Sequence, residues 1–250
     1  MQIVTKRLEG KKALVTGGAR SIGAEIVKRL ASEGASVAFT YVRSQNTADD
    51  LVAEIEAEGG RALAIRADSA DVEAVKGAVD QTVEAFGGID ILVNNAGISM
   101  MKPYAEFTSE EFDRMVAVNF KAVFAGIQAA GPRMKEGGRI INIGSIAAVS
   151  NPFPGNSLYT ATKAAVAGLT RALARDLAPQ GVTINNIQPG MIDTDMNPGD
   201  GPLAALIQDS VPLGRYGTAS EVASLVAYIA SPESSYITGA SLNVDGGTDI

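Results

Sequence analysis

Thr16-Gly17-Gly18-Ala19-Arg20-Ser21-Ile22-Gly23 is the stretch of sequence that decides the fold. It lies between a β-branched run at 11–16 and a helical pattern at 22–33. A glycine-rich turn in this place presents free backbone N–H groups and the positive end of a helix dipole to a phosphate. Gly17 allows the tight turn, and Gly23 lets the helix pack closely against the strand. The stretch predicts a dinucleotide-binding turn, with a purely structural glycine-rich turn as the alternative.

Strand and helix patterns alternate along the rest of the chain. Further strands are predicted at 36–41, 61–67, 89–93, 139–143, 182–187 and 241–244, and further helices at 46–58, 71–86, 109–135, 157–177 and 219–230. This alternation is typical of βαβ units, whose parallel strands form a sheet that helices cover. We therefore predict an α/β fold, a doubly wound Rossmann-type parallel sheet of seven strands with helices on both faces.

One domain is expected. No linker, fixed-period repeat or low-complexity tract interrupts the 250 residues, so a single dinucleotide-binding domain is predicted over 1–250. The least regular region, 190–217, is rich in Pro, Gly and Asp. An irregular segment of this length inside a compact domain is usually functional, and we expect it to be a substrate lid.

The composition excludes several classes of function. The chain has neither Cys nor His, which removes disulfides, thiolate catalysis, Ser-His-Asp hydrolysis and Cys/His metal sites; no metal is expected. The formal net charge of −7 argues against nucleic acid or a membrane surface as a partner. Residues 1–10 do not resemble a signal peptide and no run approaches ~20 apolar residues, so a cytoplasmic protein is expected. Any proton donor must be Tyr, Lys, Asp, Glu or a water chain.

Several motifs, taken together, resemble the short-chain dehydrogenase/reductase family. The turn resembles that family's TGxxxGxG fingerprint, with Ser21 where the middle glycine is usual. The other matches follow in the family's order: Asn94-Asn95-Ala96-Gly97, Asn119, Ser145, Tyr159 with Lys163, and Pro189-Gly190 with Ile192 and Thr194. They span nearly the whole chain, from about residue 11 to 247.

Tyr159, Lys163 and Ser145 form the candidate catalytic group. Tyr159 and Lys163 are four residues apart and share one face of a helix. A free tyrosine titrates near ~10, and an adjacent ammonium favours the phenolate and lowers that pKa. Such a pair on its own is usually a surface feature, but Ser145 at the carboxyl end of a strand can hold a substrate oxygen. The resemblance adds Asn119, which it implies binds a water linking Lys163 to solvent; a structural polar residue at a helix irregularity is the alternative.

The second strand ends without the acid that holds the ribose of NAD. That acid lies ~20 residues past the glycines, where this chain has Tyr41 followed by Arg43 and Ser44. Arg43 and Arg20 can pair with a 2′-phosphate, so NADP(H) is predicted; the alternative is that both are solvated surface residues. By resemblance Asp68 contacts the adenine, with capping of the following helix as the alternative. The full predicted cofactor set is Gly17, Arg20, Ser21, Ile22, Gly23, Tyr41, Arg43, Ser44, Asp68, Ser69, Asn95, Ala96, Gly97, Tyr159, Lys163, Pro189, Gly190, Ile192 and Thr194.

The leading function is NADPH-dependent reduction of a small-molecule ketone to a secondary alcohol. A 3-oxoacyl-(acyl-carrier-protein) reductase shares the motifs, but its acidic carrier needs a basic docking face, for which Arg133, Lys135, Arg139, Arg171 and Arg175 are candidates. A catalytically silent NADP(H)-sensing protein is the alternative from another class. The resemblance implies a homotetramer, and stretches of small residues in the helices at 109–135 and 157–177 agree with close helix packing.

Overall fold

A computed structural model describes residues 6–151, 153–201 and 204–250. Residues 1–5 of the N-terminal segment and residues 202–203 of the predicted lid lie outside the described residues. The strands are β1 Lys12–Val15, β2 Ser36–Tyr41, β3 Arg61–Arg66, β4 Ile91–Asn94, β5 Arg139–Ile143, β6 Thr183–Pro189 and β7 Ser241–Val244. The helices are α1 Ser21–Ser32, α2 Gln45–Ala57, α3 Val72–Phe86, α4 Ser109–Val116, α5 Ala122–Ala130, α6 Ser157–Leu177, α7 Ala204–Asp209 and α8 Ala219–Ala230.

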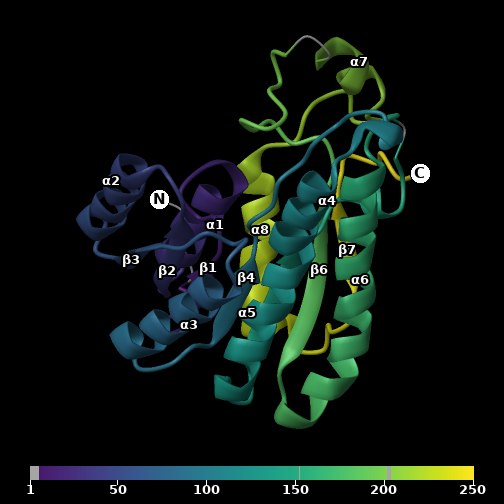
Figure 1. Ribbon diagram of the computed structural model, residues 1–250. Helices are drawn as coiled ribbons and strands as arrows, with labels where there is room; N and C mark the ends of the chain where they lie inside the picture. Colours follow the sequence, from purple (N-terminus) through teal and green to yellow (C-terminus); the bar gives the residue numbers. More distant parts are fainter. Residues whose placement is uncertain (1–5, 152, 202–203) are drawn as a thin grey trace.

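All seven strands pair in parallel, in the order β3-β2-β1-β4-β5-β6-β7. The order runs outward from β1 to one edge and from β4 to the other, so the two halves of the sheet are wound in opposite directions from their junction. In such sheets ligands bind beyond the carboxyl ends of the strands, next to that junction. The predicted doubly wound fold is confirmed (Figure 1).

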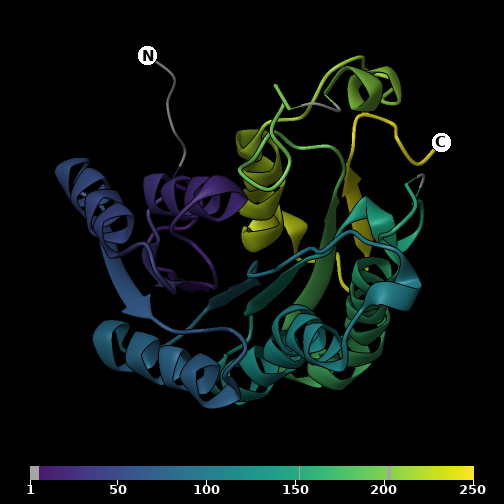
Figure 2. The ribbon, with the colours of Figure 1, turned by 45° about the horizontal axis from the view of Figure 1, so that its top comes forward.

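Side chains that alternate along each strand pack on opposite helical layers. Ala13 and Val15 of β1 point into a core shared with α1, α2 and α8, whereas Leu14 points into a core shared with α3, α5 and α6. Figure 2 shows the two layers on opposite sides of the sheet, with α1 beside α8. Both faces of every central strand are therefore buried, which is why these strands read as continuous apolar runs.

The prediction of one continuous helix at 109–135 is wrong, because this stretch is divided into several helical segments. The chain forms α4, then a π-helical turn at Ala117–Lys121, then α5, and ends in a 3-10 turn at Gly131–Arg133. In the π turn the N–H of Ala122 bonds to the carbonyl of Ala117, five residues back. One extra residue is thereby accommodated without breaking the helix axis, and such bulges concentrate at functional sites. Pro132, which has no N–H, closes the helical run.

Ser21 has a left-handed backbone. Its φ is +48°, and among the described residues it is the only non-glycine with a positive φ. This is the position where the fingerprint usually has glycine, so the backbone keeps a glycine conformation around a side chain that opposes it. A left-handed L-residue costs roughly 1–2 kcal/mol.

Ser21→Gly should therefore stabilise the protein. Relief of that strain exceeds the roughly 0.4–1 kcal/mol by which glycine favours the unfolded chain, so we expect a net gain of up to about 1 kcal/mol in the free energy of urea unfolding. Ser21→Ala is the control, since it removes the hydroxyl but keeps the strain. Equal losses of unfolding free energy in Ser21→Gly and Ser21→Ala would show that the hydroxyl of Ser21, and not its backbone strain, determines stability here.

Candidate active site

Four segments meet at the carboxyl edge of the sheet. They are the glycine-rich turn after β1, residues 95–98 after β4, residues 144–148 after β5 and the Pro189–Gly190 turn at the end of β6. The 190–217 segment, with α7, stands over this edge at the top of Figure 1. The topology thus brings together the motifs that the sequence separates by more than 170 residues.

A network of hydrogen bonds fixes the glycine-rich turn. Thr16 Oγ1 accepts the backbone N–H groups of Asn95 and Ala96, at 3.0 and 3.1 Å. The side-chain amide of Asn95 donates to the carbonyls of Thr16 and Gly17, both at 3.0 Å. A Cβ on Gly23 would lie 2.1 Å from the Gly17 carbonyl oxygen, so only glycine lets α1 approach the turn. Asn95 acts on the turn directly, as a clamp between β4 and β1.

The beginnings of α1 and α2 form a basic edge with no carboxylate in the first turn of either helix. Neither helix has an acidic residue in its first turn, and neither N-cap side chain, Arg20 or Ser44, makes a capping hydrogen bond. The free N–H groups and the helix dipoles favour anions there. Arg20 and Arg43 are exposed beside them, and Arg20 lies 3.5 Å from Asp195 of the 190–217 segment. This edge fits the phosphate groups of a dinucleotide.

Tyr41 and Asp68 lie at the same edge, at the end of β2 and after β3. Tyr41 is buried, and its hydroxyl donates to Gln45 at 2.8 Å, so an aromatic ring stands where an acid would face a ribose. The Asp68 carboxylate accepts the N–H of Ala70 and contacts Arg114, which together lower its pKa, and the charge of Arg43 acts in the same direction. Helix capping, the alternative role considered for Asp68, falls instead to Asp71, whose side chain accepts the first free N–H groups of α3. Ser69 is buried between them.

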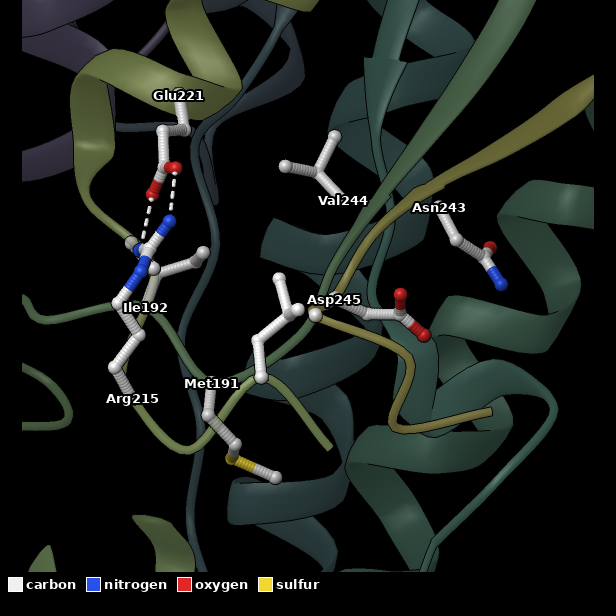
Figure 3. A pocket seen from close by; sticks show the side chains of 10 residues that line it. Met191, Ile192, Arg215, Glu221, Asn243, Val244 and Asp245 are labelled. Carbon is white, nitrogen blue, oxygen red and sulfur yellow. Dashed lines mark hydrogen bonds and ion pairs between the residues drawn. The ribbon is translucent and has the colours of Figure 1, made fainter. Parts of the chain in front are cut away.

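The 190–217 segment is anchored at both ends. Gly190 donates its N–H to Val244 at 2.9 Å, and a Cβ there would lie 2.6 Å from Asp245 Cα. At the other end Arg215 donates two hydrogen bonds to Glu221 of α8, at 2.9 and 2.7 Å, and lowers the pKa of that carboxyl to about 2. Between them a hollow of about 250 Å³ lies next to Met191, Ile192 and Val244 (Figure 3). Ile192 is buried, and Thr194 forms a tight turn with Asn197.

Tyr159, Lys163 and Ser145 lie together at this edge. The Tyr159 hydroxyl is hydrogen-bonded to Ser145, and the ammonium of Lys163 lies 5.6 Å from the centre of the Tyr159 ring. Lys163 is 4% exposed and donates to the carbonyl of Ile143 at 2.8 Å. Ser145 Oγ accepts the N–H of Ala147, so its own proton can be donated to the Tyr159 oxygen or, in its place, to a substrate oxygen.

Burial governs both titrating groups. It raises the pKa of Tyr159 above its usual value, and the Ser145 hydrogen bond acts against this. It lowers the pKa of Lys163 to about 8. In the protein alone desolvation therefore outweighs the lowering of the tyrosine pKa expected from the nearby ammonium. Tyr159 is protonated at neutral pH and is poised to act as an acid.

The side chain of Asn119 is committed to structure. It lies in the π turn, 1% exposed, with Oδ1 accepting the N–H of Ile98 and Nδ2 donating to the carbonyl of Ile98 and to Thr162. Thr162 in turn donates to the carbonyl of Tyr159 at 2.7 Å. Asn119 thus connects the segment after β4 to the helix that bears the tyrosine, while its role in a water relay stays a prediction. Sequence reasoning missed Thr162, whose only signal was its place next to Lys163.

No cluster of three or more carboxylates suited to a metal ion occurs in the part of the chain that the structure describes. None of its helices is long and apolar enough to cross a membrane. What the edge does contain is a glycine-rich turn beside an acid, a cation and a hydroxyl donor. Fold and site together define a dinucleotide-binding oxidoreductase.

Comparison with known proteins gives the family. Residues 17–249 match the family described as enoyl-(acyl carrier protein) reductase. The chain is 42% identical over 241 residues to the 3-oxoacyl-(acyl-carrier-protein) reductase FabG of Staphylococcus aureus Mu50, covering 95% of this chain and 97% of that protein. It is also 42% identical over 237 residues to the cyclic-di-GMP-binding biofilm dispersal mediator protein of Escherichia coli K12, covering 95% and 96%.

Comparison with a solved structure gives the same family. The short-chain dehydrogenase of Burkholderia cenocepacia J2315 in complex with NADP superposes with a TM-score of 0.96 at 51% identity, covering 98% of this chain and 100% of that one. This chain belongs to the short-chain dehydrogenase/reductase family.

Tyr159→Phe should nearly abolish turnover while the fold and the affinity for NADPH stay unchanged. The variant loses only the acidic proton, and general acid catalysis contributes about 10²–10⁴-fold, so kcat should fall by that factor. Steady-state kinetics and NADPH titration by fluorescence measure the two effects. The control is Tyr104→Phe, which removes a hydroxyl from an exposed tyrosine and should keep full activity.

The pH profile tests the same pair in the wild-type enzyme. Lys163 carries its charge below pH about 8, so the rate of reduction should fall as the pH rises through that value and the phenolate loses its stabilising cation. A Tyr159→Phe variant with more than half of the wild-type kcat would contradict the assignment of the acid.

Proposed function

We propose that this enzyme reduces a ketone to a secondary alcohol with NADPH. The observation that carries the proposal is the Tyr159 hydroxyl, hydrogen-bonded to Ser145 and backed by the buried ammonium of Lys163. A protonated phenol beside a hydroxyl donor is suited to protonate an oxygen on which negative charge develops. Reduction of a carbonyl creates that charge.

Each side chain has one part in this reaction. The reduced nicotinamide, when bound, supplies the hydride to the carbonyl carbon. Ser145 donates a hydrogen bond from its hydroxyl to the carbonyl oxygen and holds that oxygen as charge develops. Tyr159 transfers its proton to the same oxygen, which gives the alcohol. Lys163 stabilises the phenolate that remains until solvent returns a proton.

The cofactor is NADP(H). The turn clamped by Asn95 and the N-terminus of α1 fit the pyrophosphate, since the first turn of α1 holds no acidic residue. Arg43 and Ser44, at the N-terminus of α2, are suited to a 2′-phosphate, and Arg20 adds a second cation. The remaining predicted contacts from Ile22, Ala96 and Gly97 lie on the same edge, with Gly97 against Lys163.

A free ketone is favoured over an acyl-carrier-bound substrate. The docking face considered for a carrier is weaker than its sequence indicates, because Arg139 is 6% exposed and Arg133 pairs with Asp80. Three of its five cations remain, namely Lys135, Arg171 and Arg175. Solvated carboxylates of a carrier gain little from a buried or already paired arginine.

The complete catalytic group argues against a silent sensor. The name of the Escherichia coli relative assigns it a nucleotide-binding role, so such a function is a fair second candidate for the fold. A protein that only binds NADP(H) has no use for the costly burial of the Lys163 ammonium behind a tyrosine. The homotetramer implied by the resemblance stays a prediction, and the exposed aromatic rings of Tyr104, Phe112 and Phe124 agree with it.

Oxidation of NADPH by the purified protein tests the proposed function. We expect turnover, followed at 340 nm, with members of a panel of uncharged ketones, and slower turnover with a 3-oxoacyl group on acyl-carrier protein. Tyr159→Phe serves as the blank for background oxidation. Preference for the carrier-bound substrate would establish the rival reductase, and no turnover with either substrate class would favour the sensor.

Arg20→Ala and Arg43→Ala should each weaken NADPH binding and leave NADH binding unchanged. A charge-assisted contact is worth roughly 1.5–3 kcal/mol, or about tenfold or more in Kd, and the effect should shrink as salt is added. Calorimetric titration with both cofactors measures the ratio.

The control for the arginine variants is Arg61→Ala, which removes an arginine from the amino end of β3, the opposite edge of the sheet. If Arg20→Ala and Arg43→Ala both leave the NADPH/NADH ratio at its wild-type value, the 2′-phosphate is held elsewhere.

A further inference from the structure

Gln188, at the end of β6, is a buried amide that the reaction described above does not use. It is 2% exposed, and its Nε2 donates to the main-chain carbonyl of Ser145 at 3.0 Å. Glutamine is mostly exposed in folded proteins, and a buried one needs a hydrogen-bond partner. Here the partner is the backbone of the serine that polarises the substrate.

This hydrogen bond lies where the β5–β6 ladder stops. The last main-chain bond between the two segments runs from Gly144 N–H to the carbonyl of Ile187, at 2.7 Å. The residue after Gln188 is Pro189, which has no N–H to donate. The amide of Gln188 supplies a donor beyond the point at which the main chain can, and so extends the attachment of β6 to Ser145.

The other bonds of Ser145 do not tie it to the sheet in this way. Its carbonyl also accepts the N–H of Ala148, and its Oγ accepts the N–H of Ala147. Both donors belong to the 3-10 turn Ile146–Ala148 that Ser145 caps, so they move with the serine. The Gln188 amide comes from a neighbouring strand, and it therefore fixes the whole turn relative to the sheet.

The main chain of Gln188 is itself well held. Its strand pairs with β7, where Gln188 lies opposite Asn243, and the following Gly190 N–H bonds to Val244. The same strand leads directly into Pro189–Gly190, a turn that belongs to the predicted cofactor set. One side chain therefore links the serine to the strand end from which that turn starts.

We propose that Gln188 is a positioning residue for Ser145, setting where the serine hydroxyl lies relative to Tyr159 and the reacting carbonyl oxygen. The proposal rests on the ketone reduction proposed above. It adds a constraint that the family motifs do not include, because the residue lies outside all of them. The Ser145 hydrogen bond also lowers the pKa of Tyr159, so a displaced serine makes the tyrosine a weaker acid.

The test compares Gln188→Met and Gln188→Glu with wild type, using whichever ketone wild type reduces. A misplacement of the order of 1 Å costs about 10²-fold, so we expect kcat of Gln188→Met to fall about 10- to 100-fold, with the Kd for NADPH unchanged. Gln188→Glu keeps the length of the side chain but can donate only when protonated. Its kcat relative to wild type should therefore rise as the pH is lowered. This pH dependence tests the proposal even if Gln188→Met does not fold.

Asn185→Leu is the matched control, because Asn185 is a buried amide on the same strand that donates to a different carbonyl, that of Ile237, at 2.8 Å. It should lower stability but leave kcat of the folded enzyme near wild type. Unchanged kcat in both Gln188 variants, an equal loss of kcat in Asn185→Leu, or a loss confined to NADPH affinity would each overturn the proposal. Absence of ketone reduction in wild type would instead overturn the proposed function, so the two failures are distinguishable.

Discussion

The clamp between β1 and β4 is the constraint on which the site depends. These strands are neighbours in the sheet although more than 70 residues separate them, and the chain leaves them toward opposite layers. Four hydrogen bonds close the resulting gap, and in all of them Asn95 or Ala96 after β4 donates to Thr16 or Gly17 after β1. Without that clamp the glycine-rich turn would be an ordinary loop, and α1 would have no fixed direction in which to present its free N–H groups.

The chemistry depends in the same way on the burial of Lys163. An ammonium loses hydration on burial, and the single carbonyl of Ile143 replaces only part of it. The cost appears as a lowered lysine pKa, and the neighbouring Tyr159 is held in its protonated form. The π turn serves this arrangement, because it places Asn119 where one amide can hold the segment after β4 and the helix of Tyr159 at once. Electrostatics at the site is therefore set by packing several residues away.

Much of this could be predicted from the sequence, for reasons that differ by element. Strands β2, β5 and β7 and helices α6 and α8 have the predicted bounds, because apolar periodicity and glycine or polar breakers define them locally. A helix irregularity at Asn119 is one of the two interpretations of that residue, but its π-helical form could not be predicted, since residues 117–121 have a helical composition. The sequence alone indicates Arg139 as a docking cation. In the structure it begins β5, a strand inside the sheet, and is itself buried. The cap of α3 is Asp71, which directly precedes Val72, whereas Asp68 accepts the N–H of Ala70 and contacts Arg114.

The acidic charge of the whole protein and its basic cofactor edge are compatible because the edge is only loosely neutralised. Arg20 and Asp195 are both well exposed at 3.5 Å, and such surface pairs contribute at most about 1 kcal/mol. A phosphate group offers an arginine more charge and more acceptor oxygens than this carboxylate does. Arg20 can therefore exchange its partner at small cost. The exchange would free the Asp195 carboxylate, whereas the N–H of Asp195 would keep its contact with Ser21 Oγ at 3.5 Å, so the 190–217 segment would stay attached to the turn.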